Sequence, residues 1–217
     1  MLNRFARALF TRILTPVARA LVALGISPDV VTLVGTLGVV VGALAFYPRG
    51  QFLIGTLVIT AFVISDTLDG IMARLTNRAG AWGAFLDSTL DRLGDAAVFG
   101  GLVLYFAGKG QDAVMAGLAL ACLVLGQVVS YARARAEGLG MTADVGIAER
   151  ADRLVTALLA TGLVGLPWLH LPMMVLEVVL ALLAVASLIT VIQRMIEVRR
   201  QVLARAKVGV GAGRADA

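Results

Sequence analysis

The chain has 217 residues, of which 59% are hydrophobic and only 15% are charged, and its formal net charge is +5. Soluble domains are about 45–50% apolar and about 25% charged, so this composition excludes a soluble globular protein and indicates a membrane protein. The single cysteine, Cys122, excludes a disulfide framework and a thiolate metal cluster. Nucleic acid is not expected as a partner, because the basic residues are spread along the chain instead of forming one patch.

The first predicted element is a helix within residues 1–24. Apolar residues recur there every four positions and share one helix face, at Phe5, Leu9, Ile13 and Val17. Arginines are distributed along the same segment. An amphipathic helix of this kind is typical of the membrane interface, where arginines reach lipid phosphates. A solvated helix is the alternative interpretation.

Six apolar segments follow, each close to the length of a membrane-spanning helix. A helix rises about 1.5 Å per residue, so about 20 residues cross a hydrocarbon core of about 30 Å. The segments are residues 30–47, 52–68, 93–107, 113–131, 154–168 and 173–193. We therefore predict an all-α, polytopic fold with one six-helix domain in the lipid bilayer over residues 25–208. A disordered tail is expected over residues 209–217.

The first apolar segment carries two local signals. Ser27 and Pro28 precede it and are expected to begin the helix, with Ser27 as the N-cap. Gly38 and Gly42 form a GxxxG pattern, which fits either a close helix contact within the chain or a dimer face.

The basic residues predict the orientation of these segments. Of the 19 Lys and Arg residues, six spans place only Arg49 and Lys109 on one side of the membrane and the remaining 17 on the other. Loops rich in Lys and Arg stay in the cytoplasm. We therefore expect a plasma-membrane protein with both termini, and the loops after the second and fourth spans, in the cytoplasm.

Four aspartates bracket the second and third spans. Asp66 and Asp69 are three residues apart, and Asp87 and Asp91 are four apart, so each pair falls on one helix face. Four facing carboxylates would repel each other unless cations lay between them. Oxygen ligands without His or Cys favour Mg²⁺, Mn²⁺ or Ca²⁺. The spacing therefore predicts two divalent ions at the cytoplasmic membrane surface, an arrangement that assists in-line displacement at phosphorus.

Two other interpretations of these aspartates remain. In one, the carboxylates have a structural role and pair with Arg74, Arg78 and Arg92. In the other, the protein is a cation transporter, which predicts acidic residues spread through the depth of the membrane. The four aspartates instead cluster at one membrane surface beside Arg74, which favours an enzyme.

The aspartates belong to a longer motif. It reads D-T-L-D-G-I-M-A-R over residues 66–74 and continues with Gly83, Asp87 and Asp91. This motif resembles the signature of the CDP-alcohol phosphotransferase family at every fixed position. The similarity continues before the first span and around the last three, and is greatest to actinobacterial members that form phosphatidylinositol phosphate. Gly83 is expected to let the two metal-bearing helices pack closely.

The resemblance implies a reaction and its residues. The family transfers a phosphatidyl group from CDP-diacylglycerol to an alcohol and releases CMP, using two Mg²⁺ ions, or Mn²⁺ in their place. Asp91 matches the general base as well as a metal ligand, although a ligand role alone fits it too. The residues that match the CDP-diacylglycerol site are Asp29, Val30, Val31, Thr32, Gly70, Ala73, Arg74 and Gly80.

Three arginines are expected to bind the phosphate of the acceptor. Arg133, Arg153 and Arg194 lie at the cytoplasmic ends of the last three spans and match the basic pocket for inositol 1-phosphate in the resembling proteins. A phosphorylated acceptor needs such a pocket, whereas a neutral polyol does not. The resemblance therefore predicts inositol 1-phosphate as the acceptor and a homodimer as the assembly. Glycerol 3-phosphate, which would yield phosphatidylglycerol phosphate, is the alternative acceptor.

Overall fold

The computed structural model describes the backbone of residues 2–76 and 80–215 and the side chains of residues 13–65, 67–76 and 80–205. The described backbone consists of helices and connecting turns and contains no strand, which confirms the all-α prediction. The helices are α1 (Leu2–Ala23), α2 (Pro28–Phe46), the short 3-10 helix η1 (Tyr47–Arg49), α3 (Phe52–Val63), α4 (Ser65–Leu75), α5 (Ala81–Ala107), α6 (Ala113–Gly138), α7 (Arg150–Val164) and α8 (Met174–Ala215).

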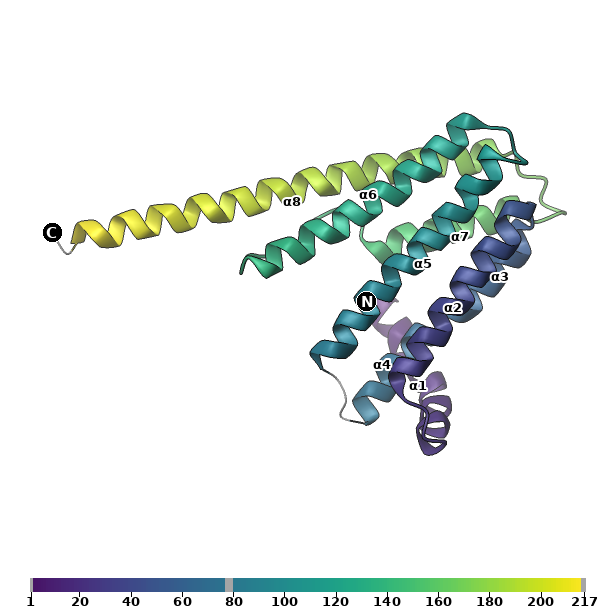
Figure 1. Cartoon of the computed structure of the whole chain (residues 1–217), viewed down its shortest axis with the longest axis horizontal. Helices are drawn as coiled ribbons and strands as arrows, with labels where there is room; N and C mark the ends of the chain where they lie inside the picture. The colour runs from purple at the N-terminus through teal and green to yellow at the C-terminus, as the bar shows by residue number, and fades with distance from the viewer. Residues whose placement is uncertain (1, 77–79, 216–217) are drawn as a thin grey trace.

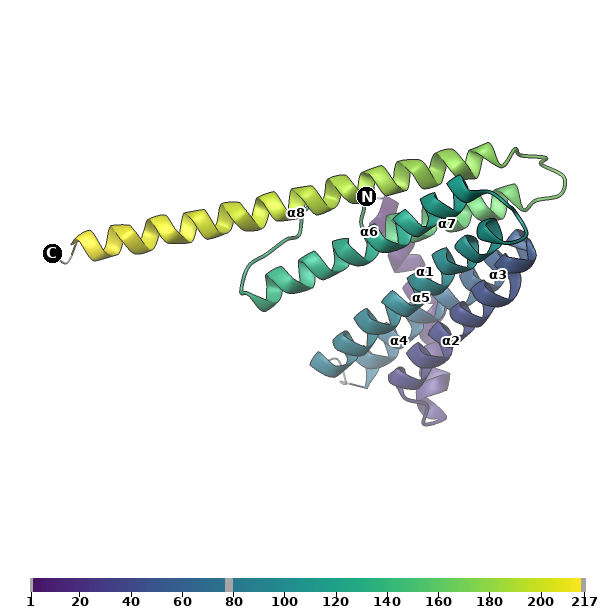
Figure 2. The ribbon, with the colours of Figure 1, turned by 45° about the horizontal axis from the view of Figure 1, so that its top comes forward.

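The helices form one bundle that is open at one end. Helix α2 packs against α3 and α5, α5 packs against α6, and α6 packs against the first part of α8 (Figure 1). Helix α7 lies between α3 and α8, and α1 lies against α4. The C-terminal half of α8 runs beyond every other helix (Figure 2). The short turns lie at one end of the bundle, so the ends that carry the candidate site residues gather at the other.

Within the described residues, four helical stretches are long and apolar enough to cross a membrane: Pro28–Arg49, Phe52–Leu75, Ala113–Gly138 and Met174–Arg205. Their outward faces are apolar, since Leu37, Leu57 and Leu182 are all exposed. Such a surface is stable in lipid and unfavourable in water. The other two predicted spans correspond to α5, whose first half is polar, and to α7, whose 15 residues extend about 22 Å.

Helix ends differ from the predicted segments in several places, three of which bear on the site or on the membrane spans. The second predicted span is divided, because α3 ends at Val63 and α4 begins at Ser65. Helix α5 begins at Ala81, twelve residues before the predicted span, and so carries two of the aspartates. Helix α7 ends at Val164 since Leu166 precedes Pro167, and the residue before a proline avoids the helical conformation.

Helix α8 continues to Ala215, through most of the segment 209–217 for which the sequence predicts disorder. Extending an existing helix needs no new nucleation, whereas Gly209, Gly211 and Gly213 lower the helix propensity of this segment.

The space around each glycine shows where two helices are in close contact. A Cβ atom on Gly38 would lie 2.3 Å from the ring of Phe62, and one on Gly42 would lie 2.9 Å from Val58. The GxxxG pattern therefore packs α2 against α3 within the chain. The prediction for Gly83 is wrong, because a Cβ atom there would meet no described atom within 4 Å.

Candidate active site

The aspartate pocket, as we call the smaller of two neighbouring pockets, lies where α2 and α5 begin. Its volume is about 270 Å³. It is lined by Pro28, Asp29 and Thr32 of α2, Asp69 and Gly70 of α4, and Gly83, Ala84 and Asp87 of α5. Ser27 caps α2 there, as predicted: its hydroxyl accepts a hydrogen bond from the backbone N–H of Val30. Pro28 occupies the first turn of the helix. Gly83 leaves room in this pocket instead of closing a helix contact.

Two of the predicted metal ligands line this pocket together. Asp69 is only 7% exposed, and Thr32 Oγ1 donates to its Oδ2 at 2.6 Å. Asp87 faces the same pocket from α5 and is exposed. Asp66 lies on α4, but its side chain is outside the described residues. The carboxylate and hydroxyl oxygens present are the donors that a hard divalent cation takes.

Asp91 lies one helical turn beyond Asp87 and contacts two arginines. Arg150 NH1 lies 2.8 Å from its Oδ1, and Arg92 NH2 lies 3.5 Å from its Oδ2. Arg150 also donates through Nε to Asp95, at 3.2 and 3.3 Å from the two oxygens. Among the described side chains, no three residues of the metal-binding types gather into one group. The structural interpretation has the aspartates pair with arginines of the motif region. Of these arginines, Arg92 does contact Asp91, and Arg78 is outside the described residues.

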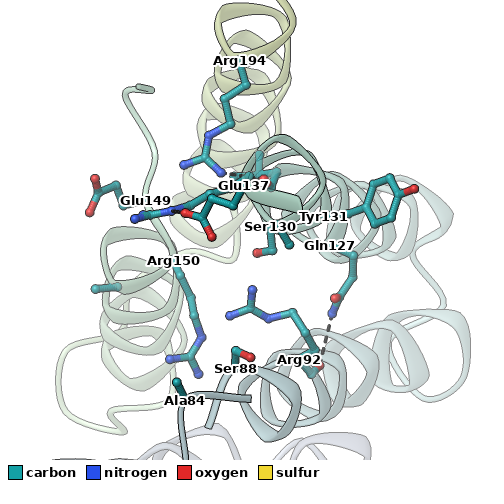
Figure 3. Close-up of a pocket in the computed structure, with 14 residues that line it drawn as sticks. Ala84, Ser88, Arg92, Gln127, Ser130, Tyr131, Glu137, Glu149, Arg150 and Arg194 are labelled. Carbon is teal, nitrogen blue, oxygen red and sulfur yellow. Dashed lines mark hydrogen bonds and ion pairs between the residues drawn. The ribbon is translucent and has the colours of Figure 1, made fainter. Parts of the chain in front are cut away.

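The arginine pocket, as we call the second and larger pocket, has a volume of about 800 Å³ and shares Ala84 with the aspartate pocket. Arg92 and Arg194 point into it from α5 and α8, and Arg150 lies along its α7 wall (Figure 3). Arg133 also lines it. Its remaining lining residues are Ser88, Gln127, Val129, Ser130, Tyr131, Ala134, Glu137, Glu149 and Ala151.

The three predicted phosphate-binding arginines are placed differently. Arg133 is half exposed and forms ion pairs of 3.0 Å with Glu137 and with Asp144. Arg194 is 4% exposed and donates to the carbonyl oxygens of Val145, at 3.0 Å, and Val129, at 2.6 Å.

Arg153 is 2% exposed and is not among the residues that line the arginine pocket. It donates to the carbonyl oxygens of Ala148, at 3.0 Å, and Gly126, at 3.4 Å. These bonds hold the start of α7 against α6. The structure therefore brings Arg133 and Arg194 to one pocket and places Arg153 behind its wall.

Only some of the residues expected to bind CDP-diacylglycerol line the aspartate pocket. Asp29, Thr32 and Gly70 line the aspartate pocket, and the indole N–H of Trp82 donates to Asp29 at 3.1 Å. Val31 packs against the apolar contact between α1 and α4. The others lie outside the pocket lining: Val30, Ala73, Arg74 and Gly80.

Sequence reasoning missed Arg150 and Asp95, and it named Arg92 only as a structural partner of the aspartates and not as a residue of the arginine pocket. Asp95 carried a usable signal, because it lies four residues after Asp91, and a further acid on that face within an apolar segment needs a partner. Arg150 carried none, since 55 residues separate it from Asp95.

A helical membrane fold with carboxylates beside a basic pocket suits an enzyme that handles phosphate esters. The model of the CDP-alcohol phosphatidyltransferase family matches residues 25–182, so the chain belongs to this family and is an enzyme of this class. The chain is 53% identical to the phosphatidylinositol phosphate synthase of Streptomyces avermitilis over 93% of this chain and 84% of the relative.

Two solved structures are similar as well, both of the phosphatidylinositol phosphate synthase of Mycobacterium tuberculosis. The one with CDP-DAG bound has a TM-score of 0.83 and 44% identity, over 86% of this chain and 94% of that one. The one in complex with manganese and citrate has a TM-score of 0.82 and 44% identity, over 85% and 88%.

Proposed function

We propose that this protein transfers the phosphatidyl group of CDP-diacylglycerol to inositol 1-phosphate, giving phosphatidylinositol phosphate and CMP. The observation that carries the proposal is that the aspartate and arginine pockets adjoin and share Ala84. An acceptor whose phosphate lies among arginines then has its hydroxyl near the carboxylates. The names of the relatives favour inositol 1-phosphate over glycerol 3-phosphate.

The metal ligands in this proposal are the four aspartates of the motif: Asp66, Asp69, Asp87 and Asp91. Two Mg²⁺ ions, or Mn²⁺ in their place, would supply Lewis-acid stabilisation of the charge on the diphosphate. The manganese complex of the Mycobacterium tuberculosis relative supports this assignment, as does the all-oxygen donor set of the aspartate pocket. Thr32 orients Asp69 by its short hydrogen bond.

Asp91 acts in this proposal as the general base. The acceptor hydroxyl attacks the β-phosphorus, which carries the diacylglycerol, and its proton passes to the Asp91 carboxylate while CMP leaves. Asp91 is placed for this role because it lies one helical turn from Asp87, which lines the aspartate pocket, and contacts Arg150, which lines the arginine pocket.

The arginines bind the acceptor phosphate. Arg133 and Arg194 line the pocket directly, and a guanidinium fork matches phosphate oxygens in two parallel hydrogen bonds. Arg153 contributes its buried charge from behind the pocket wall. The nucleotide lies across the starts of α2 and α5, against Asp29, Thr32 and Gly70.

The membrane arrangement in this proposal has six crossings, by α2, the α3–α4 pair, α5, α6, α7 and the first part of α8. The chain lies in the plasma membrane with the pockets on the cytoplasmic side and acts as a homodimer. Helix α1 lies on the membrane surface. In support of this, Ile13 and Val17 are exposed while Ala18 of the same helix is buried against Met72 of α4.

A direct assay tests the reaction. Purified protein receives CDP-diacylglycerol, Mg²⁺ and one of three acceptors: inositol 1-phosphate, myo-inositol or glycerol 3-phosphate. We expect CMP release and a phosphatidylinositol phosphate product with inositol 1-phosphate alone. Turnover only with glycerol 3-phosphate would refute the acceptor, and no CMP with any acceptor would refute the reaction.

A further inference from the structure

Arg150 combines three features, although the proposed reaction gives it no role of its own. It begins α7, it lines the arginine pocket, and its guanidinium contacts two acids one turn apart on α5. Asp91 is the candidate base, and Asp95 lies four residues further along α5; neither is among the residues that line the two pockets.

Asp95 is a nearly buried acid whose carboxylate contacts Arg150. Its side chain is 9% exposed, and both of its oxygens accept from Arg150 Nε, at 3.2 and 3.3 Å. A buried carboxylate is unfavourable without a charged partner. The contact therefore holds the guanidinium of Arg150 in one place, with its NH1 directed at Asp91.

The second contact fixes Asp91. Arg150 NH1 lies 2.8 Å from Asp91 Oδ1, a charge-assisted hydrogen bond of normal length. Two acids four residues apart on one helix face repel each other, and a cation between them removes that repulsion. The Asp91 carboxylate is thus held by a residue from another helix, one turn from Asp87 of the aspartate pocket.

We propose that Arg150, held by Asp95, is a positioning residue that orients the Asp91 carboxylate for the transfer reaction. Arg150 acts through Asp91 and does not itself bind the acceptor phosphate. The inference rests on the proposed function, since it takes Asp91 as a residue of the reaction.

The test uses CMP release by the full-length protein with the acceptor that supports the highest wild-type rate. Arg150→Met is expected to lower kcat by about 10- to 100-fold, the usual range for partners that orient a reacting group. The KM values for CDP-diacylglycerol and for the acceptor should change less than about twofold, since removing an interaction that orients the reacting group lowers kcat rather than substrate binding. Arg150→Lys keeps the charge without the fork and should recover part of kcat.

Asp95 supplies the second arm. Asp95→Asn should also lower kcat, and the Arg150→Met/Asp95→Asn double variant should be no slower than Arg150→Met alone, because both act through one contact. Arg135→Met, an exposed arginine on α6, is the matched control and should keep the wild-type kcat. The thermal midpoint of each variant in detergent reports folding, and Arg150→Lys with Asp95→Asn carries the test if Arg150→Met does not fold.

The outcomes separate the two proposals. An active wild type with unchanged kcat in Arg150→Met, or in both Arg150→Lys and Asp95→Asn, overturns the positioning role alone. A raised acceptor KM at constant kcat overturns it too, because Arg150 would then bind the acceptor. A wild type that releases no CMP with any acceptor overturns the proposed function and this inference together.

Discussion

The hydrogen bond from Thr32 to Asp69 allows a quantitative prediction about metal binding. The Thr32 hydroxyl has one proton, and Asp69 Oδ2 at 2.6 Å is a nearer acceptor than the Pro28 carbonyl at 3.1 Å. Because Asp69 is 7% exposed, water replaces this bond poorly. A hydrogen bond to a charged group contributes about 1.5–3 kcal/mol, which corresponds to about 10- to 150-fold in an equilibrium constant.

Thr32→Val removes the hydroxyl and keeps the shape of the side chain. We expect the Mn²⁺ concentration for half-maximal CMP release to rise about 10- to 100-fold, the range found for residues that orient metal ligands. Thr32→Ser restores the donor and should stay within about threefold of wild type. Direct Mn²⁺ titration by electron paramagnetic resonance checks that binding is what changes. A Thr32→Val protein with wild-type Mn²⁺ dependence would show that Thr32 does not orient a metal ligand.

Four further predictions follow from the same geometry. Asp87→Asn should abolish CMP release, and excess EDTA should do the same reversibly, with Mg²⁺ restoring activity; residual turnover in either case would exclude the metal-ligand role. Gly83→Ala should keep or raise the thermal midpoint, since Ala is favoured over Gly in helices by about 1 kcal/mol, yet raise the KM for CDP-diacylglycerol by narrowing the aspartate pocket. Gly38→Ala should instead lower the thermal midpoint and leave that KM unchanged, because its Cβ would lie 2.3 Å from Phe62. Arg153→Ala should raise the acceptor KM and also lower the thermal midpoint, since two carbonyls lose their donor; an unchanged KM would remove Arg153 from the acceptor site.

Local signals in the sequence were sufficient for several of these features. Ser27 and Pro28 begin α2 because a cap depends on residues within one turn. Helix periodicity indicates which aspartates of one helix share a face, and Asp69 of α4 and Asp87 of α5 line one pocket. The apolar content of the segments likewise indicated helices that could cross a membrane, and four described stretches have the required length and hydropathy.

Contacts between distant helices were beyond such reasoning. Gly83 follows the motif spacing that suggests close packing, but whether another helix lies beside it depends on how α4 and α5 diverge, and they leave a pocket there. Asp91 shares a helix face with Asp87, yet it forms an ion pair of 2.8 Å with Arg150 of α7. The sequence contains no local trace of either arrangement.

The position of Arg150 depends on the whole connection between α6 and α7. Gln201 of α8 exchanges hydrogen bonds with the backbone of Thr142, and Arg194 donates to the carbonyl of Val145. Thr190 Oγ1 accepts from the backbone N–H of Ile147 and of Ala148, at 3.2 and 3.1 Å. These partners lie 42 to 59 residues apart in the sequence. Arg194, a predicted phosphate-binding residue, therefore also stabilises the segment that positions Arg150 beside Asp91. A substitution at Arg194 should for this reason affect both acceptor binding and kcat.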